Sequence, residues 1–196
     1  MSMITIGIDP GLDGWIAVLD DGKIGRQATL YPIPVIEGRR RQYDAIGIYR
    51  FFGPAFLKGG ILTADDDVRG VWIEEPGVFP HLVEKCPGCH MELEYCPHCT
   101  RRLPLRKNAM AAASQARCHA LFELTCAVHD IPFNPVAARS WKKIMLAGTS
   151  GDKQAAIVRA KQLFPGVRLR ATSRCKKDNP DMAEALMIAA YGERVL

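Results

Sequence analysis

Residues 4–20 read ITIGIDPGLDGWIAVLD and contain two apolar runs joined by a Pro-Gly turn. The first run alternates isoleucine with other residues, which predicts a strand over 4–9 with Asp9 at its end. The second run predicts an antiparallel partner over 14–20, so the two runs form a β-hairpin. A carboxylate at the end of a strand is a place where a metal site can begin, and its role depends on the partners that the rest of the chain supplies.

The composition is typical of one globular domain. The chain has 196 residues, of which 48% are hydrophobic, enough to bury a core. No apolar run reaches the ~18 residues that a membrane helix needs, and residues 1–5 lack a signal-peptide pattern. The net charge of +5 suits a polyanionic partner without requiring one. Because four of the seven cysteines follow a metal-binding pattern, we expect a reducing, cytoplasmic compartment. Because no apolar run is long enough to span a membrane, we expect no membrane partner.

The rest of the chain alternates between strand and helix patterns. We expect further strands over 23–32, 71–73 and 131–136, and helices over 42–58, 107–129, 137–145, 152–164 and 180–194. Residues 78–106 differ, because they combine four cysteines and four prolines with little periodicity, and we interpret them as an insertion. Antiparallel strands followed by alternating strands and helices predict an α/β fold, with a mixed sheet and helices on both of its faces.

Three further carboxylates are candidate partners of Asp9. Glu74 directly follows a predicted strand, and Asp181 and Glu184 stand three apart on one face of the last helix. The apolar remainder of that helix must pack against the sheet, which brings both acids near it. Mg²⁺ prefers oxygen ligands, and two ions ~3.5–4 Å apart promote phosphodiester hydrolysis. Taken singly, each acid is better explained as an ordinary solvated residue, whereas the combination points to a metal site.

Three segments together resemble motifs of the RuvC-type Holliday junction resolvases, which belong to the RNase H-like nuclease superfamily. The segments are residues 6–20, 71–76 and 181–192. Residues 138–142 with 151–153 also resemble the paired-lysine region of that family, and the overall form is similar to RuvC-like proteins of bacteriophages. The resemblance covers the chain apart from 78–106. It implies an RNase H-like domain over 1–196, with a mixed five-stranded sheet flanked by helices.

The resemblance also implies roles for individual residues. The ligands of two Mg²⁺ or Mn²⁺ ions would be Asp9, Glu74, Asp181 and Glu184. Lys142 and Lys153 match basic residues near the scissile phosphate. Two alternatives stay open, since Glu75 can replace Glu74, although it would point to the opposite face, and Asp178 can replace Asp181. The resemblance further implies a homodimer in DNA recombination and repair, with two active sites on opposing strands of a four-way DNA junction.

Four cysteines form a second candidate metal site within the insertion. They follow the spacing C-x2-C-x6-C-x2-C and are Cys86, Cys89, Cys96 and Cys99. Two such pairs suit tetrahedral Zn²⁺, and four thiolates leave no open coordination position, so the zinc is structural. We therefore predict a zinc knuckle or ribbon, which either grips DNA, shapes the dimer or only stabilises the insertion. Disulfides and a redox site fit the expected compartment and the spacing less well.

Basic residues gather at 39–41, 101–107, 142–143 and 168–177. Such residues supply phosphate contacts to nucleic acids, although many exposed basic residues are only solvated. The leading hypothesis is a crossover junction endodeoxyribonuclease that cuts four-way junctions by paired phosphodiester hydrolysis. Alternatives are a nuclease acting on forks, flaps or RNA–DNA hybrids, and a non-catalytic zinc-ribbon DNA-binding protein. An actin-like kinase or ATPase also opens with a strand and hairpin, but it needs a second similar half, which 196 residues cannot contain.

Overall fold

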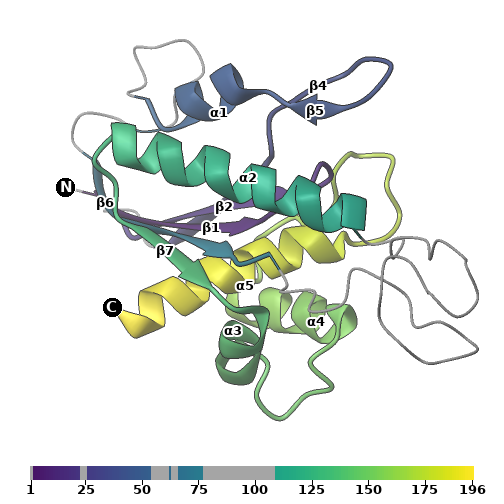
Figure 1. Cartoon of the computed structure of the whole chain (residues 1–196). Helices are drawn as coiled ribbons and strands as arrows, with labels where there is room; N and C mark the ends of the chain where they lie inside the picture. Colours follow the sequence, from purple (N-terminus) through teal and green to yellow (C-terminus); the bar gives the residue numbers. More distant parts are fainter. Residues whose placement is uncertain (1, 23–25, 54–61, 63–65, 77–108) are drawn as a thin grey trace, which may run out of the picture.

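A five-stranded sheet with the order β3-β2-β1-β6-β7 forms the centre of the computed structural model, which describes residues 2–22, 26–53, 62, 66–76 and 109–196 (Figure 1). The strands are β1 Ser2–Asp9, β2 Trp15–Asp20, β3 Gln27–Pro32, β6 Asp66–Glu74 and β7 Phe133–Val136. β2 pairs antiparallel with β1 and β3, whereas β6 pairs parallel with β1 and β7, which confirms the expected mixed sheet. The predicted insertion, with Cys86, Cys89, Cys96 and Cys99, lies outside the described residues.

Helices cover both faces of the sheet (Figure 1). The helices are α1 Ala45–Phe51, α2 Ala109–Val128, α3 Ala138–Met145, α4 Lys153–Leu163 and α5 Pro180–Val195. One core lies between the sheet and α1 with α2, where Cys118, Phe122 and Cys126 are buried. The other lies between the sheet and α3, α4 and α5, with Trp141 fully buried in it. Within the described ranges, no helix is both long and apolar enough to cross a bilayer.

Glycine allows α5 to pack directly on β1. A Cβ atom at Gly7 would lie 2.2 Å from the backbone nitrogen of Ala189, so any side chain there would push the helix away. Gly192 acts in the same way further along, because its Cβ would lie 2.5 Å from the ring of Trp72. Since side chains alternate along a strand, the face of β1 that carries Gly7 also turns Asp9 toward α5.

The N-terminus of α5 is fixed by a capping residue, Asn179. The side-chain oxygen of Asn179 accepts from the N–H of Asp181 at 2.8 Å and from that of Met182 at 3.3 Å. Pro180 occupies the first helical position, where its missing N–H costs nothing. The cap and the close packing on β1 together hold the first turn of α5 at the end of the sheet where β1 finishes.

Two segments depart from the sequence-based expectation. In the helical pattern over 42–58, which Gly53-Pro54 interrupts, the described residues form α1 Ala45–Phe51, and it begins at residue 45 because Asp44 caps it by accepting from Gly47 N–H at 2.9 Å. The residues before the cap form β5 (Gln42–Tyr43), which pairs with β4 (Val35–Ile36) in a small hairpin. Strands of two residues show no periodicity, so the sequence pattern could not reveal them. β6 begins at Asp66, whereas the sequence predicted a strand only from residue 71. The sequence pattern missed residues 66–70 because most of them are polar and do not resemble a buried strand.

Candidate metal and active site

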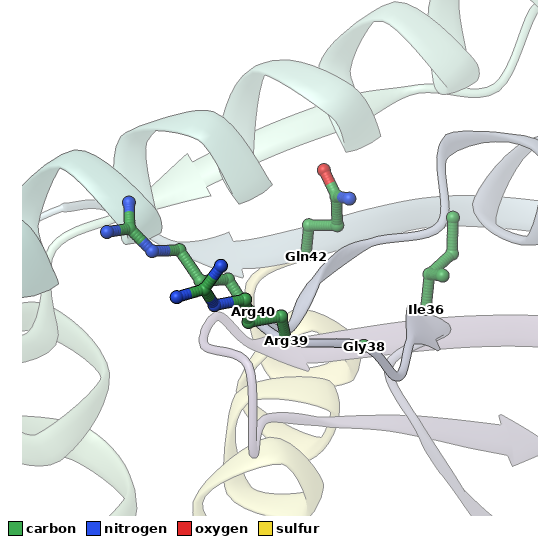
Figure 2. A pocket seen from close by; sticks show the side chains of 5 residues that line it. All are labelled: Ile36, Gly38, Arg39, Arg40 and Gln42. Carbon is green, nitrogen blue, oxygen red and sulfur yellow. The ribbon is translucent and has the colours of Figure 1, made fainter.

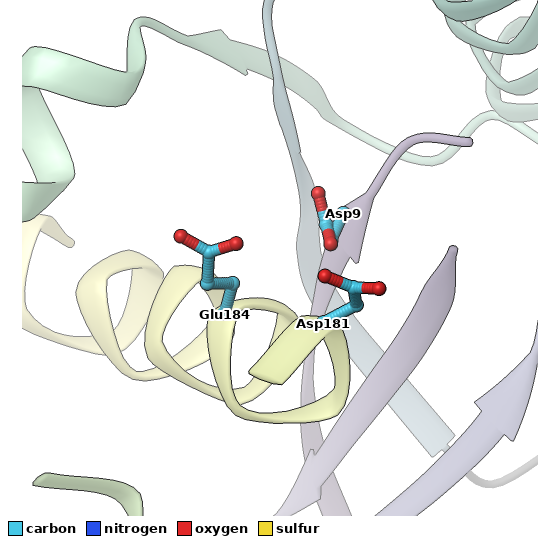
Figure 3. Close-up of side chains that lie close together, drawn as sticks. All are labelled: Asp9, Asp181 and Glu184. Carbon is cyan, nitrogen blue, oxygen red and sulfur yellow. The ribbon is translucent and has the colours of Figure 1, made fainter. Parts of the chain in front are cut away.

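Four acidic side chains converge at one edge of the sheet. Asp9 ends β1 and Glu74 ends β6, and these neighbouring parallel strands finish at the same edge. Asp181 and Glu184 come from the first turns of α5, which packs across that edge. Carboxylate oxygens of Asp9, Asp181 and Glu184 all lie within 4.8 Å of one another (Figure 3). The structure therefore brings together residues that lie more than 170 positions apart in the sequence.

Glu74 is oriented by a buried tryptophan, Trp141, for which the sequence predicted no role in the site. The Nε1–H of Trp141 donates to Oε2 of Glu74 at 2.8 Å. Glu75 instead has an exposed side chain, and its backbone N–H donates to the carbonyl of Val136 at 2.9 Å. The geometry thus favours Glu74 over Glu75 as the candidate metal ligand at the end of β6. The one sequence signal for Trp141 was its place directly before Lys142.

The geometry also separates Asp181 from Asp178. The Oδ2 atom of Asp178 lies 2.5 Å from Nζ of Lys161, and its Oδ1 lies 3.5 Å from Nε of Arg170. The hydrogen bond from Lys161, together with both positive charges, holds the pKa of Asp178 below its usual range. Asp178 is therefore bound to α4, whereas Asp181 joins Asp9 in the cluster.

Two lysines contact the cluster, both of them predicted site residues. Nζ of Lys153 lies 2.5 Å from Oδ1 of Asp181 and 3.8 Å from Oε2 of Glu184. Nζ of Lys142 lies 2.9 Å from Oε1 of Glu184. Helix geometry positions both lysines, since Lys142 follows the buried Trp141 in α3 and Lys153 is the first residue of α4. Each lysine thus approaches the carboxylates from a different helix.

Burial and mutual repulsion raise the pKa values of the acids at the strand ends. Burial raises the pKa of Asp9 well above its ordinary value, and the charges of Glu184, Glu74 and Asp181 raise it further. Burial also raises the pKa of Glu74, although the hydrogen bond from Trp141 and nearby positive charge oppose it. Burial lowers the pKa of Lys153, but its hydrogen bond with Asp181 and the acidic charges around it outweigh burial, so its pKa is raised.

The cluster fits a divalent cation. Glu184 is only 5% exposed, and within the described part of the chain its Oε1 accepts no hydrogen bond. The ammonium of Lys142 lies beside this oxygen at ion-pair distance but outside hydrogen-bonding geometry. The ammonium compensates part of the charge on this oxygen, and Mg²⁺ or Mn²⁺ would supply the direct partner that it lacks. Together with the repulsion that raises the pKa of Asp9, this makes the four acids a suitable set of ligands.

The strand order and the helices on both faces define an RNase H-like fold. Among solved structures, T. thermophilus RuvC in complex with a Holliday junction substrate has a TM-score of 0.53 and 13% sequence identity, covering 100% of this chain and 96% of that one. A second structure of Thermus thermophilus RuvC has a TM-score of 0.49 and 14% identity with the same coverage. No protein-family model and no curated protein sequence matches the chain. The likeness to the first of these structures shows that the chain has the RuvC fold, which confirms the predicted α/β fold with a mixed five-stranded sheet.

Proposed function

We propose that this protein is a metal-dependent endonuclease that resolves four-way DNA junctions by paired phosphodiester hydrolysis. The observation that carries the proposal is the carboxylate cluster, in which oxygens of Asp9, Asp181 and Glu184 lie within 4.8 Å of one another. Its place at the ends of β1 and β6, in a fold shared with a RuvC structure that holds a Holliday junction substrate, supports this choice of substrate.

Each site residue has a role in the proposed reaction. Asp9, Glu74, Asp181 and Glu184 would hold two Mg²⁺ or Mn²⁺ ions, which when bound activate the attacking water and stabilise the leaving oxygen. Lys153 carries an ammonium group beside Asp181 and Glu184, and this positive charge can stabilise charge on the phosphate. Lys142 supplies a second positive charge beside Glu184. Trp141 keeps Glu74 turned toward the site.

The proposal includes a homodimer formed through the exposed face of α2. Small and apolar side chains line this face as a stripe of Ala113, Ala116, Ala120, Leu124, Ala127 and Val128, all of them exposed. Leu124 is 64% exposed and Val128 is 58% exposed, whereas the opposite face of α2 is buried on the sheet. A second copy covering this stripe would remove apolar surface from water and provide two active sites for two strands.

Sedimentation of paired variants tests the dimer. We expect Leu124→Asp to sediment as a monomer, because the new carboxylate would be buried in the interface. Val158→Asp is the matched control, since Val158 is 48% exposed on α4, away from the stripe, and should leave the oligomeric state unchanged. A Leu124→Asp variant that remains dimeric contradicts this interface.

The proposal also includes a structural Zn²⁺ bound by the four cysteines of the insertion. Their C-x2-C-x6-C-x2-C spacing supports it, and the reducing cytoplasm of a bacterium or phage-infected host would keep the thiols available. Elemental analysis of the purified protein should find one zinc per chain. A variant with Ser at Cys86 and Cys89 that keeps its zinc would contradict this assignment.

Cleavage of a panel of labelled substrates tests the function directly. The panel contains a four-way junction, a Y-fork, a linear duplex and an RNA–DNA hybrid, each incubated with Mg²⁺ or Mn²⁺, and Asp9→Asn serves as the control. We expect symmetric cuts in opposing strands of the four-way junction. Binding without cleavage of any substrate would contradict the nuclease. Much faster cleavage of the fork or the hybrid would keep the nuclease but overturn the junction as its substrate.

A further inference from the structure

The β4–β5 hairpin carries three consecutive arginines, and the last of them holds the hairpin in place. Nη1 of Arg41 lies 2.5 Å from Oδ1 of Asp13, and its Nη2 donates to the carbonyl of Leu12 at 2.8 Å. Its Nε donates to Oε1 of Glu37 at 3.0 Å, within the hairpin itself. Asp13 and Leu12 belong to the turn between β1 and β2, which directly follows Asp9. Arg41 therefore attaches the hairpin to the turn beside the carboxylate cluster.

Arg39 and Arg40, unlike Arg41, do not attach the hairpin to another described part of the chain. Both are exposed, and neither has an ion pair or hydrogen bond within the described part of the chain. They line a recess of about 510 Å³ together with Ile36, Gly38 and Gln42. Figure 2 shows both side chains extending to the same side of the hairpin, away from Ile36. Two permanent positive charges on one side of a short hairpin repel each other, and an anionic ligand would relieve that repulsion.

A second basic segment lies across from the hairpin, between α4 and α5. Its exposed basic side chains, which have no ion pair within the described residues, are Arg168, Arg174, Lys176 and Lys177. Ala171 and Asn179 line a recess of about 480 Å³ together with Arg41 and the two acids that it binds, Asp13 and Glu37. The unpaired basic side chains lie outside this recess, in the two segments that border it, and add positive charge around the turn that follows Asp9.

We infer that the β4–β5 hairpin binds phosphates of the DNA strand that leads into the carboxylate site, through Arg39 and Arg40. This inference rests on the proposed function, because it takes the cleaved DNA as the ligand. The planar guanidinium of arginine can bind two phosphate oxygens at once. Asp13 lies four residues after Asp9, a span of at most ~14 Å. Because Arg41 ties the hairpin to this turn, the contacted phosphates belong to the strand that runs past the turn into the site.

The salt dependence of junction binding tests this inference. The variant R39A/R40A is compared with the control R50A/R194A, which removes the same charge from exposed arginines at the ends of α1 and α5 far from the cluster. We expect the slope of log affinity against log salt to fall by about 1.8 in R39A/R40A, since each phosphate contact contributes ~0.9. The affinity advantage of the wild type then shrinks roughly twelvefold between about 50 and 200 mM salt. The control should keep the wild-type slope, and R39K/R40K should keep most of it.

A second measurement locates the contact on the DNA. Junctions that carry one neutral methylphosphonate, placed at successive positions on each side of the cut, should bind the wild type more weakly at the positions that the hairpin contacts. R39A/R40A should show no such loss at the same positions. If this variant cuts DNA and matches the wild type in salt slope and methylphosphonate profile, the hairpin inference is wrong while the proposed function stands. If the wild type binds junctions but never cuts them, the proposed function is wrong, and the salt slope still decides the hairpin.

Discussion

The carboxylate cluster and the β4–β5 hairpin lie near the same turn, but the charged groups of the cluster are paired and those at the tip of the hairpin, within the described residues, are not. In the cluster, buried acids are bound by two lysines and a tryptophan and are supplied by two long strands and a capped helix. In the hairpin, Arg39 and Arg40 stand in the loop between two strands of two residues each and have no ion pair among the described residues. Chemistry needs ligands fixed in position, whereas phosphate contacts need only a local positive charge. The difference suggests that the cluster determines the rate of cleavage and the hairpin the affinity for DNA.

The largest effect is expected from Asp9→Asn. This change removes the carboxylate at the centre of the cluster, and losing one preorganised electrostatic group costs on the order of 10³-fold in rate. Junction affinity should be unchanged or higher, because a negative charge near the DNA is lost. Cleavage rates at saturating DNA and binding in EDTA measure the two quantities separately.

Asp178→Asn is the matched control for this prediction. Asp178 is bound to Lys161 and Arg170 on the α4 side, so its amide variant should keep the wild-type cleavage rate. An equal loss of rate in both variants would mean that Asp178, not only Asp181, serves the site.

A change inside the fold should disturb the cluster and spare the hairpin. In Gly7→Ala the new Cβ would lie 2.2 Å from the nitrogen of Ala189, so α5 must shift together with Asp181 and Glu184. Overpacking of this kind costs about 1–3 kcal/mol in the free energy of unfolding, which urea denaturation measures. Gly166→Ala is the control, because a Cβ there meets nothing within 4 Å. Equal stability of the two variants would show that β1 and α5 are not packed this closely.

A smaller effect is expected from Trp141→Phe. The phenyl ring still fills the core, but Glu74 loses the hydrogen bond that orients it. Loss of a group that orients a metal ligand typically costs about 10–100-fold in metal affinity or activity. We therefore expect a higher Mn²⁺ concentration for half-maximal cleavage, with the rate partly restored at saturating Mn²⁺. An unchanged metal dependence would show that the tryptophan acts only in packing.

The smallest effect is expected on the pH dependence of the thermal stability of the metal-free protein. Burial and the neighbouring acids raise the pKa of Asp9 in the folded state, so the folded protein binds this proton more tightly than the unfolded chain. The resulting stabilisation is complete below the ordinary pKa of about 3.9 and is lost as the pH rises through the raised value. In EDTA, the melting temperature of the wild type should therefore fall relative to Asp9→Asn as the pH rises. A difference that does not depend on pH would contradict a raised pKa.

Sequence alone was enough for the framework of the site, because that framework depends on local patterns. The alternation of isoleucines correctly predicted β1 with Asp9 at its end, and the helix predicted over 180–194 corresponds to α5. Neighbouring parallel strands then brought Glu74 to the same edge.

The features that the sequence did not predict depend on contacts between residues that lie far apart in the chain. The bond from Trp141 to Glu74 joins positions 67 apart, and no local pattern encodes it. The choice of Asp181 over Asp178 depends on where α4 places Lys161 in space. The β4–β5 hairpin was missed because its strands are too short to show a period. These contacts follow from tertiary packing, which the structure supplies.

Anomalous scattering from crystals soaked in Mn²⁺ tests the central claim most directly, because it locates the metal without relying on activity. The account predicts two Mn²⁺ ions at the sheet edge, bound by carboxylates among Asp9, Glu74, Asp181 and Glu184. The same soak of Asp9→Asn should show weaker sites or none. Wild-type crystals without Mn²⁺ at this cluster, or with Mn²⁺ bound at Asp178 instead, would contradict the account.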